Sequence, residues 1–100
     1  MSLYRHGDVM LNQIDALPEG AKKRGSVTLA YGEITGHSHR IADPHSAETF
    51  ELDGQIYLKV VAPKAQLIHE EHAMIELPQG IYRVWQQREY SPGAIRRVSD

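Results

Sequence analysis

Hydrophobic and polar positions along the chain alternate with the period of two that is typical of strands, and the 3.6-residue period of a helix is hard to find. Runs that contain β-branched or aromatic residues are separated by Gly, Pro, Asp and Ser. The predicted strands cover residues 8–14, 26–31, 37–42, 48–52, 55–62, 66–70, 73–77 and 81–89, with a short tail over 95–100. The pattern therefore predicts an all-β fold of eight or nine short strands, a jelly roll or small β-barrel.

The turn residues divide these runs. Asp53-Gly54 between two alternating runs is the strongest hairpin signal in the sequence. Pro63 and the segment Pro78-Gln79-Gly80 are expected to end strands, because proline cannot donate to a β-ladder. The sequence of residues 66–74 is compatible with a strand, a loop or a helix, since several of these residues are weak strand formers.

The length and net charge of the chain limit the number of domains and the classes of partner that we expect. A chain of 100 residues supports one domain with one modest core, so we expect residues 1–100 to form a single all-β unit. The formal net charge of −2 argues against a nucleic-acid-coating protein, which would be clearly basic. The sequence shows no apolar run of membrane-spanning length and no signal-peptide core, so we expect a cytoplasmic protein without a membrane partner.

The chain has six histidines and no cysteine, so a metal site would have to use His, Asp or Glu. In a strand, His37 and His39 point to the same side as Ile41, which favours the interior. Two inward imidazoles at this spacing can converge on one cation. The alternative is a pair of exposed histidines on an edge strand.

A second pair, His69 and His72, flanks Glu70-Glu71. A helix would place both imidazoles on one face, whereas a strand would place them on opposite faces and allow only one to reach the first pair. A solvated acidic loop is the plain alternative. We predict that one divalent ion, Zn, Fe, Mn or Ni, is bound by His37 and His39 together with one or both of His69 and His72. His6 is interpreted as an N-terminal surface residue, with a position in the site as the alternative, and His45 is interpreted as an exposed turn residue.

The central part of the chain resembles the two cupin motifs. The first motif is matched in part by Gly32, His37, His39, Glu48 and Gly54, with altered spacing around the glutamate. The second motif keeps only its Pro-x-Gly element, residues 78–80, and other residue types stand where it has its ligand histidine and asparagine. The resemblance implies a cupin-like barrel from a superfamily of oxygenases, isomerases and small-ligand binders, and it carries over only the paired histidines as ligands.

These features predict a small cupin-like domain that binds one metal ion and a small molecule. Arg40 and Arg83 are the expected anion-binding residues, because a guanidinium offers a fork of donors. Whether the metal would serve catalysis stays open at this stage. The alternative is a non-enzymatic oligomeric interaction module with incidental histidines, and a homo-oligomer is expected in either case. A pH-responsive interface is a third interpretation, because six histidines can titrate.

Overall fold

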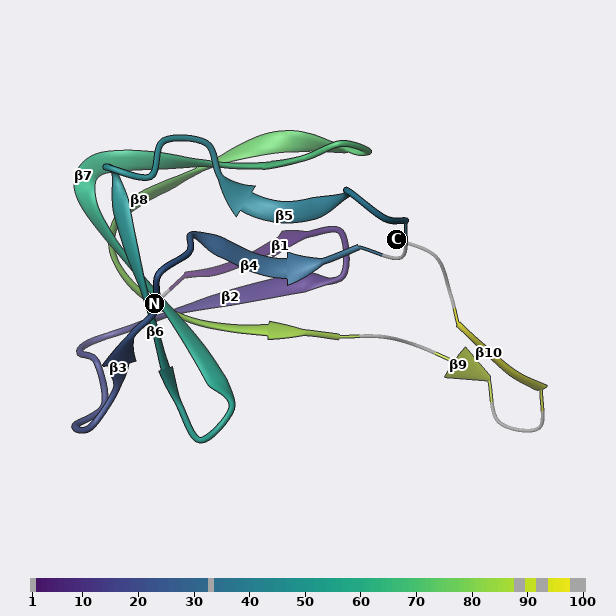
Figure 1. The fold of residues 1–100 in the computed structure, drawn as a ribbon, viewed down its shortest axis with the longest axis horizontal. Coiled ribbons are helices and arrows are strands. Elements are labelled where there is room, and N and C mark those ends of the chain that lie inside the picture. Colours follow the sequence, from purple (N-terminus) through teal and green to yellow (C-terminus); the bar gives the residue numbers. More distant parts are fainter. Residues whose placement is uncertain (1, 33, 88–89, 92–93, 98–100) are drawn as a thin grey trace.

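The protein is described by a computed structural model that covers residues 2–32, 34–87, 90–91 and 94–97. Eight antiparallel strands form one sheet that curls into a half-barrel (Figure 1). The order is β1-β2-β8-β7-β5-β4, with β6 paired to β7 and β3 paired to β6. The prediction of an all-β domain is confirmed.

The strands of this sheet are β1 (Leu3–His6), β2 (Val9–Ile14), β3 (Lys22–Lys23), β4 (Thr28–Tyr31), β5 (Ser38–Ile41), β6 (Ala47–Leu52), β7 (Gln55–His69) and β8 (His72–Gln86). A separate two-stranded pair consists of β9 (Tyr90–Ser91) and β10 (Ala94–Arg97). Residues 88–89 of the predicted strand 81–89 and residues 98–100 of the predicted tail lie outside the described residues.

The predicted Asp53-Gly54 hairpin joins β6 to β7. Both turn residues have positive φ angles, 51° and 80°, and Leu52 pairs with Gln55 directly across the turn. Asp and Gly tolerate this left-handed conformation, which matches the twist of the two strands. The hairpin prediction is confirmed.

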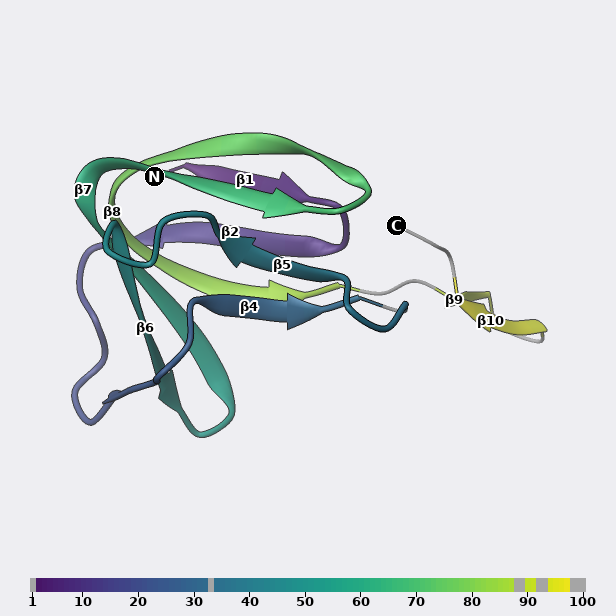
Figure 2. The ribbon, with the colours of Figure 1, turned by 45° about the horizontal axis from the view of Figure 1, so that its top comes forward.

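The predicted breaks at Pro63 and at residues 78–80 are wrong. Strands β7 and β8 each run for 15 residues and pass through these positions. Val60 pairs with Gly80 and Lys64 with Pro78, so three residues of β7 oppose a single residue of β8. A bulge of this kind bends the strands and needs no donor from proline. The two long strands therefore turn a corner there (Figures 1 and 2).

Because of this corner, the β7–β8 hairpin contributes to both halves of the half-barrel. The first half of β7 pairs with β6, and its second half pairs with β5. The core between them is apolar: Val9, Leu11, Leu29, Ile41, Ala47, Leu58, Val60, Ala65, Leu67, Leu77, Tyr82 and Val84. Burial raises the pKa of Tyr82 to about 12, and its hydroxyl donates to the Pro78 carbonyl at 2.6 Å. Tyr31, at the end of β4, is 71% exposed and lies outside this core.

Within the described residues, no helix has the length and apolar character needed to cross a membrane.

Candidate metal centre

Three connections meet at one end of the half-barrel: the β1–β2 turn, the β4–β5 loop and the β7–β8 turn (Figure 2). Contacts between them bring the histidine-bearing segments together. The ring of His72 packs on Gly7 of the first turn, and the ring of His69 packs on Gly32 of the second connection. Residues far apart in the sequence therefore share one small space.

The segment left open by the sequence is a tight hairpin. Strand β7 ends at His69, Glu70-Glu71 form the turn, and His72 begins β8 as the register partner of His69. Side chains of directly paired residues lie on the same face of an antiparallel ladder. Both imidazoles therefore enter the site. A helix is not present there, and the expectation that an extended chain would separate the two rings is wrong, because the turn reverses the chain between them.

His39 lies on β5 and is completely buried, as is its strand neighbour Ile41 at 2% exposure. The predicted inward orientation of this histidine is confirmed. His37 precedes β5, and its side chain is 23% exposed. Its ring lies 5.7 Å from that of His69, centroid to centroid. It stands at the rim of the cluster.

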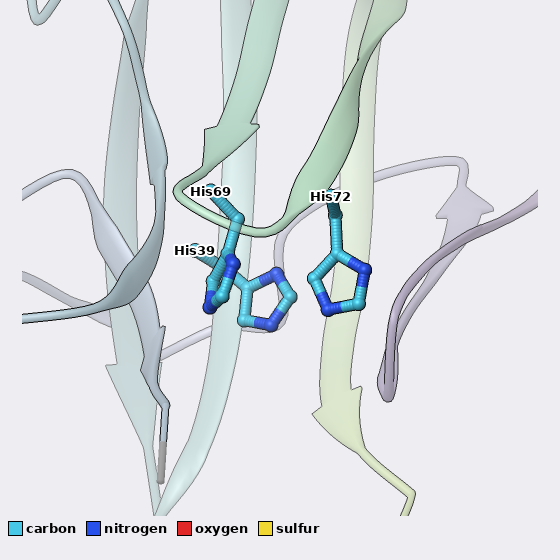
Figure 3. Close-up of side chains that lie close together, drawn as sticks. All are labelled: His39, His69 and His72. Carbon is cyan, nitrogen blue, oxygen red and sulfur yellow. The ribbon is translucent and has the colours of Figure 1, made fainter. Parts of the chain in front are cut away.

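One ring nitrogen from each of His39, His69 and His72 lies within 4.8 Å of the other two, so the three form a group that could hold a metal ion. Figure 3 shows the three side chains projecting into one space from the β7–β8 tip and from β5. The Nε2 atoms of all three are buried and have no hydrogen-bond partner among the residues that the structure describes. Buried polar atoms are normally satisfied, so three such nitrogens at one place require an explanation.

A second group with one ligand atom each consists of His37, His69 and Glu70. The carboxylate of this group, that of Glu70, already has two other partners. Glu70 accepts a hydrogen bond from the Ser38 N–H at 3.0 Å and forms an ion pair with Arg40 at 2.9 Å. The bond from Ser38 lowers the pKa of Glu70. These contacts hold the hairpin tip against β5 and keep the first group assembled.

Hydrogen bonds fix the tautomer of His39 through His6. The Nε2 atom of His6 lies 2.9 Å from the carbonyl oxygen of Ala73, which can only accept, so this nitrogen carries a proton. The Nδ1 atom of a neutral His6 then accepts, and it lies 2.9 Å from Nδ1 of His39. His39 therefore donates through Nδ1 and keeps its lone pair on Nε2, one of the unpartnered nitrogens.

The surroundings of His6, His39 and His69 favour their neutral forms. Burial, together with the neighbouring His69 and His6, lowers the pKa of His39 to about 4. Burial also lowers the pKa values of His6 and His69, and neighbouring histidines act in the same direction. A neutral imidazole is the form that binds a metal ion, so the lowered pKa values of His39 and His69 favour the binding form near pH 7.

The two arginines expected to bind an anion have other contacts. Arg40 is ion-paired to Glu70 and donates to the Ser38 carbonyl. Arg83 lies on the exposed side of β8, with its guanidinium 4.6 Å from the centre of the Trp85 ring. A ligand-binding role for either residue stays a prediction.

The favoured interpretation of His6 as a surface residue is wrong, because this residue is 3% exposed and lies inside the cluster. The signal was present: Tyr4 and His6 alternate with the exposed Leu3 and Arg5, and a Gly-Asp pair follows, which is typical of a two-residue hairpin. His45 is exposed, as predicted. Glu48, the glutamate of the partial cupin motif, forms an ion pair with Lys23 at 3.1 Å and belongs to neither candidate ligand group.

Replacing Gly7 with Ala should destabilise the protein by about 2 kcal/mol or more and displace the His72 ring. Gly7 has a φ of 63°, and an added Cβ would lie 2.6 Å from His72 Nε2. Left-handed backbone costs a non-glycine residue about 1–2 kcal/mol before any clash. Urea unfolding of Gly7→Ala measures the loss. Gly25→Ala is the control, because no atom beyond Gly25 and its two chain neighbours lies within 4 Å of the added Cβ. An equal loss in both variants would contradict the prediction.

The fold and the cluster define a small all-β half-barrel domain with a histidine-rich rim that could hold a metal ion. The chain belongs to the family described as "Domain of unknown function (DUF8820)", which matches residues 5–87. The matched range includes His6 and all three residues of the first ligand group. No curated protein matches the chain, and no solved structure matches it.

Proposed function

We propose that this domain binds one divalent transition-metal ion through His39, His69 and His72. The observation that supports the proposal most strongly is the set of three buried, unpartnered Nε2 atoms on rings whose nitrogens lie within 4.8 Å of one another. Ligand atoms of a tetrahedral zinc site are about 3.3 Å apart when the metal–nitrogen bonds are 2.0–2.1 Å long. Loading therefore draws the three rings inward.

The donor set favours some of the expected ions over others. Imidazole ligands suit Zn, Fe and Ni, whereas carboxylate and water ligands suit Mn and Mg. Three protein ligands leave a fourth position for water or a small molecule, as in metal sites that perform chemistry. Asp8 lies beside His39, with Oδ1 3.5 Å from His39 Nε2. A cupin-like role in small-molecule binding is consistent with such an open site.

His39 and His69 differ in the protonation of Nε2 in their neutral forms. The N–H of Glu71 donates to Nδ1 of His69 at 3.0 Å, so the proton of the neutral His69 ring lies on Nε2. A metal bound at Nε2 moves that proton to Nδ1, where it faces the Glu71 N–H. Loading thus breaks this hydrogen bond and shifts the hairpin turn, and the Glu71 amide is a local reporter of binding.

Cobalt(II) titration of the EDTA-treated protein is expected to saturate at one ion per chain. The absorption bands of a four-coordinate site and a changed amide resonance of Glu71 should appear together. The amide of Asp53, in the hairpin that joins β6 to β7, is the internal control. Absence of stoichiometric binding with Co²⁺, Zn²⁺, Ni²⁺ and Fe²⁺ would contradict the proposal and favour the interaction module.

A further inference from the structure

His6 lies between the hairpin and the buried end of β5 and contacts both. Its Nε2 donates to the Ala73 carbonyl at 2.9 Å, and its Nδ1 lies 2.9 Å from Nδ1 of His39. Its ring packs edge-on against those of His39 and His72, with centroid distances of 5.0 and 5.6 Å. Neither ligand group that the described residues form includes His6.

The two hydrogen bonds of His6 determine which ring nitrogen of His39 carries the proton. The Ala73 carbonyl is a backbone acceptor on β8, so it determines which nitrogen of His6 is protonated. His6 then presents a lone pair to His39, which places the proton of His39 on Nδ1. The opposite tautomer of His39 would set two lone pairs against each other at 2.9 Å and put a proton on Nε2, which would then have no lone pair for a metal ion.

We infer that His6 is a positioning residue that holds the Nε2 lone pair of His39 toward the bound ion. The inference rests on the proposed metal-binding function. It assigns a role in metal binding to a histidine that is not itself a ligand. The second ring N–H of a ligand histidine commonly donates to a carboxylate, carbonyl or water. Here that partner is a neutral imidazole, itself oriented by the backbone of the strand that carries His72.

Two amide variants separate the two hydrogen bonds of His6. In His6→Asn the side-chain oxygen is attached to Cγ, as Nδ1 is, and can still accept from His39. In His6→Gln the amide lies one bond further out, so its N–H can still donate to Ala73 while the acceptor near His39 is lost. Both variants remove the ring, so packing losses are shared.

Cobalt(II) and zinc titrations of the whole chain should give a dissociation constant about 10–100-fold higher for His6→Gln than for the wild type, the usual cost of losing such a partner. His6→Asn should stay within about threefold of the wild type. Equal losses in both variants, in proportion to their lowered stability, would mean that His6 only fills space and would overturn the inference.

A measurement without metal keeps this test independent of the proposed function. Nitrogen-15 NMR of the EDTA-treated wild type should show His39 protonated at Nδ1 and unprotonated at Nε2. His6→Gln should shift His39 toward a mixture of tautomers, whereas His6→Asn should preserve the wild-type form. A wild-type His39 protonated at Nε2 would overturn the inference, and failure of metal binding with the expected tautomer would reject the proposed function alone.

Discussion

Zinc at about 100 times its dissociation constant is expected to raise the melting temperature of the wild-type protein by roughly 10–20 °C. Binding to the native state alone contributes about 2.7 kcal/mol at that concentration, and each kcal/mol shifts a domain of this size by about 4–8 °C. His39→Ala should lose most of this shift, because it removes the ligand whose lone pair is already directed into the site. Differential scanning fluorimetry with zinc and with EDTA measures the difference.

Two histidine variants serve as matched controls for this shift. His45 has a side chain that is 95% exposed, so His45→Ala should keep the full effect of zinc. His37→Ala should keep most of it, since His37 lies outside the group formed by His39, His69 and His72. If His37→Ala abolished the shift and His39→Ala did not, the ion would belong to the group that contains Glu70. An equal shift in all variants would place zinc elsewhere on the protein.

Local sequence patterns predicted the features that depend only on residues adjacent in the sequence. Alternation with Ile41 placed His39 in the interior, and the positive φ angles of Asp53-Gly54 follow from the residues themselves. The alternation of Tyr4 and His6 before a Gly-Asp pair carries the same kind of information. These features need only the pleat of a strand and the preferences of a turn.

The turn at Glu70-Glu71 has no comparable local signal. It is held by contacts from a distant strand, the Ser38 N–H and the Arg40 guanidinium on the Glu70 carboxylate, and these contacts exist only after β5 has paired with β7. Pro63 is a similar case. Its place inside a 15-residue strand depends on a bulge in which Val61 and Ala62 donate to the Ser46 carbonyl instead of to β8. Tertiary contacts override local preference at both positions.

Acidification is expected to destabilise the metal-free protein by about 2 kcal/mol between pH 7 and pH 4.5 through His39 alone. Burial lowers the pKa of this ring from 6.5 to about 4, so below pH 6.5 the unfolded chain binds a proton that the folded chain rejects. The stabilisation is fully present above pH 6.5 and is lost as the pH falls toward 4. The lowered pKa values of His6 and His69 add losses of the same sign. Urea unfolding in EDTA across this range measures the effect.

Variants at two histidines assign the pH dependence to the cluster. His39→Gln removes the buried titrating ring, so it should be less stable than the wild type at pH 7 and approach it toward pH 4.5. His45→Ala should keep the wild-type slope, because that side chain is 95% exposed. Glu70 contributes in a lower window, because the Ser38 N–H lowers its pKa below 4.5 and its stabilisation is lost only beneath that pH. A wild-type free energy of unfolding that stays constant from pH 7 to pH 4.5 would show that the His39 imidazole is not held neutral. The buried lone pair on which metal binding depends would then lack its physical basis.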